Sequence, residues 1–184
     1  MSALISPPLK LVILDRDGVI NVDSEHYIRS PDDWHFIPGS IDAIALLNQK
    51  GYTLSIATNQ SGLARGYYDE AMLEAIHQRM HWALATVGAK IDSIFYCPHG
   101  PEEACLCRKP KPGLLHQIAA HYQTTLTQVP FVGDSFRDIE AALNAGAKPR
   151  LVLTGNGEKT RRLHAQALEN VPCYTDLWSF ATNI

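Results

Sequence analysis

Short apolar runs alternate with longer segments of helical period along this chain of 184 residues. Five runs have the length and composition of buried strands: residues 11–14, 53–57, 93–96, 130–132 and 150–153. Amphipathic helical segments lie between them, and the first is expected to be capped by Ser40. This alternation indicates a mainly parallel sheet with helices on both faces, joined by right-handed crossovers. The predicted fold class is therefore α/β, a Rossmann-like three-layer α/β/α arrangement.

Length and composition favour a single domain that spans residues 1–184. A chain that is 46% hydrophobic and 19% charged at this length can bury one good core but is short for two. The formal net charge is −3 and the basic residues are scattered, which argues against nucleic acid as a partner. No apolar run approaches the roughly 18 residues of a membrane span, and residues 1–10 lack a signal-peptide pattern. We expect a cytoplasmic monomer that acts on a small molecule.

The first predicted strand ends in two acids. Asp15 and Asp17 follow residues 11–14 directly, and open α/β sheets bind ligands at the carboxyl ends of their strands. One carboxylate can attack phosphorus to give an aspartyl-phosphate, while a second passes a proton to the leaving group and later takes one from water. A solvated turn is an equal alternative for this segment taken alone, since Asp-Gly is common in turns.

Other predicted strand ends and loops carry complementary polar groups. Residues 58–62, Thr-Asn-Gln-Ser-Gly, offer a hydroxyl, amides and backbone N–H groups suited to a phosphoryl oxygen. Asp134 follows the fourth strand and could join Asp15 in binding Mg²⁺. In a loop, Lys109 could neutralise a transferring phosphoryl group and Arg108 could grip a second anion. Each feature alone has a structural explanation, as a turn, a helix cap or a surface pair, but together they favour one reaction site.

These motifs, in this order, resemble the haloacid dehalogenase superfamily of phosphohydrolases, and the resemblance covers nearly all of the chain. It implies that Asp15 is the nucleophile and Asp17 the general acid and base, while Thr58 and Lys109 steady the phosphoryl group. It also implies that Asp15, Asp134 and the backbone carbonyl of Asp17 hold Mg²⁺. Many members insert a cap domain, but the stretch between Asp15 and the second strand is short. A capless core is expected, in which short loops select the substrate.

Residues 97–107 hold a second group of metal-binding residue types. Three thiols and one imidazole within this short segment fit a closed tetrahedral zinc site; they are Cys97, His99, Cys105 and Cys107. Disulfides are the alternative, but cytosolic thiols stay reduced and a bond between Cys105 and Cys107 would be strained. With no vacant position, the predicted Zn²⁺ is structural and fixes Arg108 and Lys109. Cys173 lies outside this cluster.

A pair of histidines occurs on one predicted helix. His77 and His81 have the i, i+4 spacing that can bind a metal on a helix face. Gln78 stands where the metalloprotease motif requires Glu. We therefore predict no metal site at this pair.

Within the superfamily, the zinc loop and motifs are similar to the branch of heptose bisphosphate phosphatases and histidinol-phosphate phosphatases. Residues 15–23, DRDGVINVD, and residues 58–66, TNQSGLARG, resemble the heptose bisphosphate phosphatases. Histidinol-phosphate phosphatases more often have Asp at the position of Ser61 and lack the Ala-Arg-Gly ending. Two features depart from the heptose pattern: the gap between His99 and Cys105 is short, and Ser135 replaces a Lys found in many relatives.

The resemblance implies a Mg²⁺-dependent phosphomonoesterase that removes the 7-phosphate of a heptose 1,7-bisphosphate. Histidinol phosphate or another small phosphosugar is the alternative substrate, and a catalytically silent phosphosugar-binding module stabilised by zinc is a third possibility. Arg108 would meet the second phosphate of a bisphosphate. The other residues expected to bind substrate are Asn21, Asp23, Tyr27, Asn59, Gln60, Ser61 and Arg65.

Overall fold

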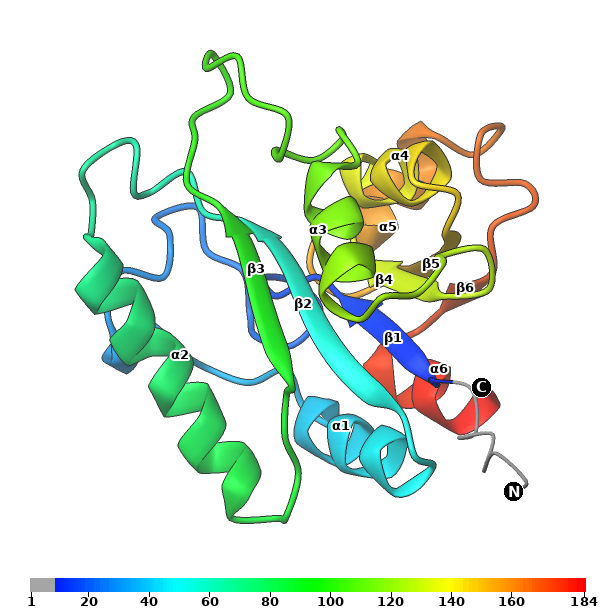
Figure 1. Ribbon diagram of the computed structural model, residues 1–184, viewed down its shortest axis with the longest axis horizontal. Coiled ribbons are helices and arrows are strands. Elements are labelled where there is room, and N and C mark those ends of the chain that lie inside the picture. The colour runs from blue at the N-terminus through cyan, green and yellow to red at the C-terminus, as the bar shows by residue number, and fades with distance from the viewer. Residues whose placement is uncertain (1–8) are drawn as a thin grey trace, which may run out of the picture.

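Six parallel strands form one sheet at the centre of the computed structural model, which describes residues 9–184 (Figure 1). The strand order is β3-β2-β1-β4-β5-β6, so the strand that precedes the two acids lies in the interior of the sheet. The strands are β1 (Leu11–Leu14), β2 (Thr53–Asn59), β3 (Ser93–Cys97), β4 (Pro130–Gly133), β5 (Lys148–Val152) and β6 (Cys173–Tyr174). All paired strands run parallel. The predicted α/β class is confirmed.

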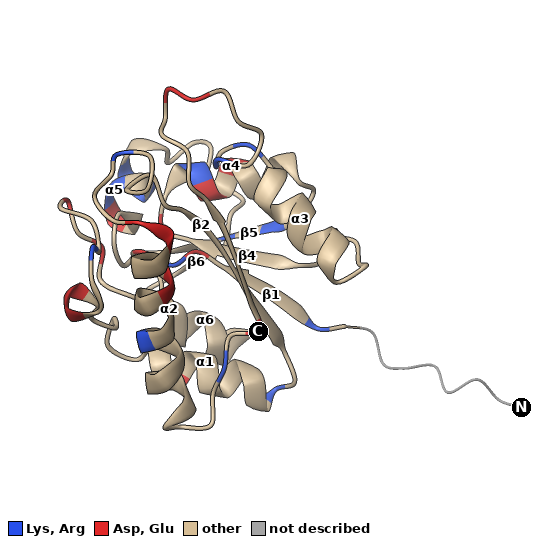
Figure 2. Ribbon diagram, turned by 60° about the vertical axis from the view of Figure 1, so that its left-hand side comes forward, with Lys and Arg blue, Asp and Glu red and all other residues tan. Residues whose placement is uncertain are grey.

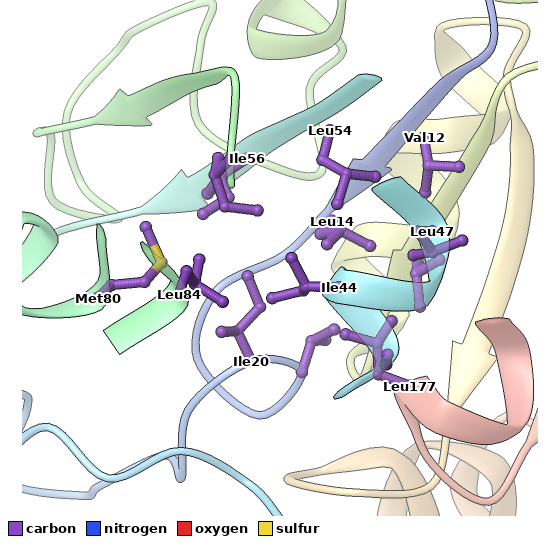
Figure 3. Packing of buried hydrophobic residues seen from close by; sticks show 14 of the residues in the cluster. Val12, Leu14, Ile20, Ile44, Leu47, Leu54, Ile56, Met80, Leu84 and Leu177 are labelled. Carbon is purple, nitrogen blue, oxygen red and sulfur yellow. The ribbon is translucent and has the colours of Figure 1, made fainter. Parts of the chain in front are cut away.

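Helices cover both faces of the sheet. They are α1 (Ser40–Gln49), α2 (Glu70–Ala85), α3 (Gly113–His121), α4 (Phe136–Asn144), α5 (Gly157–Leu163) and α6 (Leu177–Asn183), with a short 3₁₀ helix η1 (Pro31–Asp33). Val12 and Leu14 of β1 belong to a core with α1, α2 and α6, part of which Figure 3 shows. Leu11 and Ile13 point to the opposite face and share a core with α3 and α4. Since successive side chains of a strand alternate between faces, burial of all four explains why this segment is uniformly apolar.

The structure corrects several predicted boundaries. Strand β2 continues through Thr58 and Asn59, which the sequence placed in the following loop. Strand β5 begins at Lys148 and ends at Val152, rather than covering residues 150–153. Helix α1 is preceded by Gly39 as its N-cap, and Ser40 lies inside the helix, where its hydroxyl donates a hydrogen bond to the Ile20 carbonyl at 2.8 Å. Elements β6, α5 and α6 were not predicted.

All loops that could carry chemistry leave one edge of the sheet, because parallel strands place their carboxyl ends together. The connection from β1 to α1 contains η1 and loop segments, with no inserted cap domain. Figure 2 shows acidic and basic ribbon segments intermixed near α4, α5 and the start of α2, whereas α3 is uncharged. Among the residues that the structure describes, none of the helices is long and apolar enough to cross a bilayer.

Candidate active site

A cavity of about 340 Å³ opens at the carboxyl ends of the strands. Its walls come from the loops that follow β1, β2, β3, β4 and β5. The structure brings nearly all of the predicted reaction and substrate residues to it: Asp15, Asp17, Asp23, Tyr27, Thr58, Asn59, Gln60, Ser61, Arg65, Arg108, Lys109 and Asp134. Asn21 does not line this cavity.

A buried lysine joins two carboxylates at the base of the cavity. The Nζ of Lys109 lies 2.8 Å from Oδ1 of Asp15 and 2.6 Å from Oδ1 of Asp138, and its side chain is only 3% exposed. Asp138 is held in turn by Ser135, whose backbone N–H and hydroxyl donate to its Oδ2 at 3.0 and 2.6 Å. Burial alone would lower the pKa of Lys109, but the charges of Asp138 and Asp15 outweigh it and raise this pKa. Lys109 is therefore cationic and directed at the proposed nucleophile.

The same region could hold a divalent cation. Carboxylate oxygens of Asp15, Asp134 and Asp138 lie within 4.8 Å of one another, and all three residues are buried. Burial, followed by the charge of Asp138, raises the pKa of Asp134 to about 7 and holds that of Asp15 well above its usual range. Because only one lysine offsets these acids, a hard cation with oxygen ligands fits the site. Lys109 and Ser135 already occupy the oxygens of Asp138, which leaves Asp15 and Asp134 as ligands.

Two glycines shape the pocket around Asp134. A Cβ on Gly18 or Gly155 would collide with the Asp134 carboxylate. Gly18 also has a φ of +81°, which favours glycine. The Asp134 Oδ2 accepts a hydrogen bond from the backbone N–H of Asn156 at 2.7 Å. The turn at Asp17 and Gly18 therefore lies directly against the cluster of buried acids.

Binding of Mg²⁺ is expected to weaken as the pH falls below about 7. Asp134 has a raised pKa of about 7, so below that pH its carboxyl must release a proton to bind a cation. The dissociation constant for Mg²⁺ should therefore rise by up to about tenfold for each pH unit below the pKa. Isothermal titration calorimetry in buffers of different ionisation enthalpy measures both the affinity and the proton release. An affinity that stays constant across this pH range would contradict the prediction.

The second acid, Asp17, is held by a dense set of donors. Its Oδ1 accepts from Nε and Nη2 of Arg16 at 3.3 and 2.9 Å and from Nδ2 of Asn21 at 2.9 Å. Its Oδ2 accepts from Nε2 of Gln60 at 3.0 Å. Burial alone would raise the pKa of Asp17, but the charge of Arg16 and these hydrogen bonds together lower it. Asn21, expected beside the sugar, is fully buried and instead supports Asp17.

The end of β2 is fastened to the loop that carries Lys109. Nδ2 of Asn59 donates to the Lys109 carbonyl at 3.1 Å, and the Lys109 N–H donates to Oδ1 of Asn59 at 3.0 Å. Thr58 is 1% exposed and its Oγ1 accepts from Nε2 of Gln60 at 2.8 Å. Tyr68 fixes the other end of the Gln60 amide by donating to its Oε1 at 2.7 Å. The predicted phosphoryl-binding groups therefore lie in one continuous hydrogen-bonded network.

Cys97, His99, Cys105 and Cys107 form one compact cluster. Their ligand atoms all lie within 4.8 Å of one another. The Sγ atoms of Cys97 and Cys107 are 3.1 Å apart, beyond the length of a disulfide, and all four cysteines of the described residues are free. Nη1 of Arg108 donates to the His99 carbonyl at 3.0 Å, which ties the guanidinium to this loop. Three thiols and an imidazole at this spacing could hold one metal ion.

Besides the buried Arg16, three arginines line the cavity: Arg65, Arg108 and Arg137. Burial and then the positive charge of Arg137 lower the pKa of Arg108, so the two cations lie near each other. No role was predicted from the sequence for Arg137, Asp138 or Asn156. The one available signal was position, since all three follow predicted strands β4 and β5 at the functional edge of the sheet.

The chain is similar to known proteins over most of its length. A family model described as HAD-hydrolase-like matches residues 106–179. The chain is 57% identical to a D-glycero-β-D-manno-heptose-1,7-bisphosphate 7-phosphatase of Bordetella bronchiseptica, over 83% of this chain and 85% of that protein. A protein of the same name from Pseudomonas putida is 54% identical over 96% of this chain and 99% of its own length.

One solved structure has the same fold as this chain and superposes closely on it. The crystal structure of D,D-heptose 1,7-bisphosphate phosphatase from B. bronchiseptica, complexed with magnesium and phosphate, superposes with a TM-score of 0.91. It is 52% identical, and the alignment covers 95% of this chain and 97% of that one. The expected resemblance is confirmed: the chain belongs to the haloacid dehalogenase-like hydrolases, in the family of the D-glycero-β-D-manno-heptose-1,7-bisphosphate 7-phosphatases.

Proposed function

We propose that this protein removes the 7-phosphate of D-glycero-D-manno-heptose 1,7-bisphosphate through an aspartyl-phosphate intermediate. One observation carries the proposal: a single cavity combines the Asp15–Lys109 pair with Arg108 and Arg137, two neighbouring cations that form no ion pair with the described residues. The first set suits the reacting phosphate and the second suits another phosphate on the same molecule. The names of the similar proteins support the same substrate.

Each step uses a residue already placed in the cavity. A carboxylate oxygen of Asp15 attacks phosphorus, and the bond from phosphorus to the sugar oxygen breaks. The negative charge of the bound phosphate opposes the lowering of the Asp17 pKa by Arg16, so Asp17 takes up a proton when substrate binds and gives it to the leaving oxygen. Asp17 then removes a proton from water, which attacks the aspartyl-phosphate, releases inorganic phosphate and regenerates Asp15. Lys109 and Thr58 stabilise the charge on the phosphoryl oxygens. Mg²⁺, held by Asp15, Asp134 and the Asp17 carbonyl, would neutralise the same oxygens.

The wall of the cavity favours a bisphosphate over histidinol phosphate. Arg108 and Arg137 lie close enough for each to affect the other, and a second phosphate would offset this repulsion. Histidinol phosphate has a single phosphate and a basic side chain, so it would leave both guanidinium groups without a partner. We assign the sugar contacts to Asp23, Tyr27 and Ser61, which line the same cavity. The product, a heptose 1-phosphate, would enter nucleotide-heptose synthesis for the lipopolysaccharide core.

A direct comparison of substrates tests the proposal. Phosphate release is measured with purified protein and Mg²⁺ on heptose 1,7-bisphosphate and on histidinol phosphate. We expect kcat/KM to be at least about tenfold higher for the bisphosphate, because a bidentate contact to the second phosphate is made only with that substrate. A preference for histidinol phosphate would overturn the substrate assignment.

Arg137→Gln is expected to reduce this preference. The change removes a cation from the wall of the cavity but leaves the Asp15–Lys109 pair intact. We expect kcat/KM for the bisphosphate to fall about tenfold, mainly through KM, and that for histidinol phosphate to change little. Arg161→Gln is the matched control, since Arg161 pairs with Glu158 outside this cavity. Equal losses on both substrates would contradict a role at the second phosphate.

We infer that the metal of the Cys97 cluster is a structural Zn²⁺. Thiolate and imidazole ligands suit this ion, and three cysteines with one histidine complete its four positions. We also infer that residues 1–184 form one phosphatase domain that works as a cytoplasmic monomer. The single sheet supports one domain.

A further inference from the structure

Arg16 lies between the two catalytic acids in the sequence, and its side chain is only 1% exposed. Its Nε and Nη2 both donate to Oδ1 of Asp17, and its guanidinium lies 5.6 Å from the centre of the Trp34 ring. A guanidinium has five N–H donors in a rigid plane, so the direction of one edge fixes the direction of the others. Whatever holds the remaining nitrogen of Arg16 therefore also orients the Asp17 carboxylate.

That nitrogen is held by His77 of α2. The Nη1 of Arg16 lies 3.3 Å from Nε2 of His77, which is 3% exposed. Arginine can only donate, so Nε2 must accept and the ring must carry its proton on Nδ1. Burial and then the charge of Arg16 lower the pKa of His77 to about 3, which keeps the ring neutral as this contact requires. His77, for which no metal role was predicted, therefore contacts Arg16 as a hydrogen-bond acceptor.

The arrangement connects a helix on the sheet face to a catalytic acid. Helix α2 packs through Ile76 and Met80 into the same core as β1, so the position of His77 is fixed on both sides by buried apolar residues. Asn21 and Gln60 complete the donors around the Asp17 carboxylate. Without an acceptor at residue 77, a donor of Arg16 would be buried without a partner, and the guanidinium would be free to turn toward another acceptor.

We propose that His77 is a positioning residue that acts through Arg16 to orient Asp17 for proton transfer to the leaving oxygen. The proposal rests on the role of Asp17 as general acid in the proposed function. Proton transfer matters most when the leaving oxygen is strongly basic, as in a sugar phosphate. An activated aryl phosphate such as p-nitrophenyl phosphate releases a stable phenolate and needs little proton transfer at the bond-breaking step. Loss of the positioning residue should therefore penalise the sugar phosphate selectively.

The test compares kcat/KM for two classes of substrate in three variants. The alkyl substrate is whichever of heptose 1,7-bisphosphate and histidinol phosphate the unaltered protein hydrolyses faster, and the aryl substrate is p-nitrophenyl phosphate. For His77→Leu we expect about a tenfold loss on the alkyl phosphate, seen in kcat rather than KM, and less than about a twofold loss on the aryl phosphate. His77→Gln, whose Oε1 can accept from Arg16, should restore most of the loss. His81→Leu, one turn further along α2, is the control and should leave the ratio unchanged.

Equal losses on both substrates, or no loss on either, would overturn the positioning role. Circular dichroism checks that each variant is folded. If His77→Leu unfolds, His77→Asn replaces it, because the shorter Asn side chain keeps a polar group but holds its acceptor oxygen further from Arg16. The choice of alkyl substrate keeps the two proposals apart. A preference for histidinol phosphate contradicts the proposed substrate but still allows the His77 measurement, whereas an unchanged alkyl-to-aryl ratio contradicts only the His77 inference.

Discussion

Asp15→Asn is expected to lower phosphate release by at least about four orders of magnitude. The amide is a poor nucleophile, and it also removes a carboxylate from the cluster that could hold a cation. The neighbouring groups should stay in place, because Lys109 keeps its second ion pair with Asp138. The loss should therefore lie in the reaction rather than in the fold.

Rapid quenching with ³²P-labelled substrate measures the intermediate directly. The unaltered protein should retain acid-stable label, and Asp15→Asn should retain none. Asp42→Asn, on the exposed side of α1, is the matched control and should behave as the unaltered protein. Unchanged Mg²⁺-dependent phosphate release in Asp15→Asn would rule out Asp15 as the nucleophile, whereas no phosphate release by the unaltered protein would favour the catalytically silent binding module.

Cys107→Ser is expected to remove most of the bound zinc and to reduce kcat/KM at least about tenfold. The cluster holds both ends of the loop, and Arg108 and Lys109 follow Cys107 directly. Without the metal, the contact from Arg108 to the His99 carbonyl loses its support. The melting temperature should also fall, since zinc binding to a folded site contributes to the free energy of folding.

Zinc per chain is measured by plasma mass spectrometry alongside kcat/KM and thermal unfolding. Cys173→Ser is the matched control, because Cys173 is exposed and lies outside the cluster. It should keep about one zinc per chain and full activity. A Cys107→Ser protein with undiminished zinc, or with undiminished activity after zinc loss, would contradict the structural role.

The sequence was most informative where chain order and chemistry coincide. Asp15 and Asp17 follow a uniformly apolar strand, and parallel topology alone places them at the functional edge. Residues 58–62 and Asp134 reach the same edge for the same reason. The contact between Lys109 and Asp15 could be predicted only from the resemblance to a family, because Lys109 lies in an irregular loop whose path no periodic pattern determines.

The misplaced or missed residues have physical explanations. Asn21 was expected to face the sugar because its residue type suits a hydroxyl, but the same amide satisfies a buried carboxylate. Arg137 has no motif of its own, and only the direction of α4 brings it to the cavity. Strand β6 has two residues, too few for an alternating pattern. Ser40 has the residue type of a cap, but Gly39, with a φ of +83°, is the N-cap.

The paired hydrogen bonds between Asn59 and the backbone of Lys109 have a consequence for how relatives of this protein can diverge. They fasten the Lys109 backbone to the end of β2, so the position of this lysine does not depend on the tip of the loop between His99 and Cys105. That tip is open to solvent, since residues 101–104 are exposed. Residues between His99 and Cys105 can therefore be inserted or deleted without displacing the charged group that serves the reaction. Changes of length in this segment offer a route to new substrates that leaves the chemistry intact.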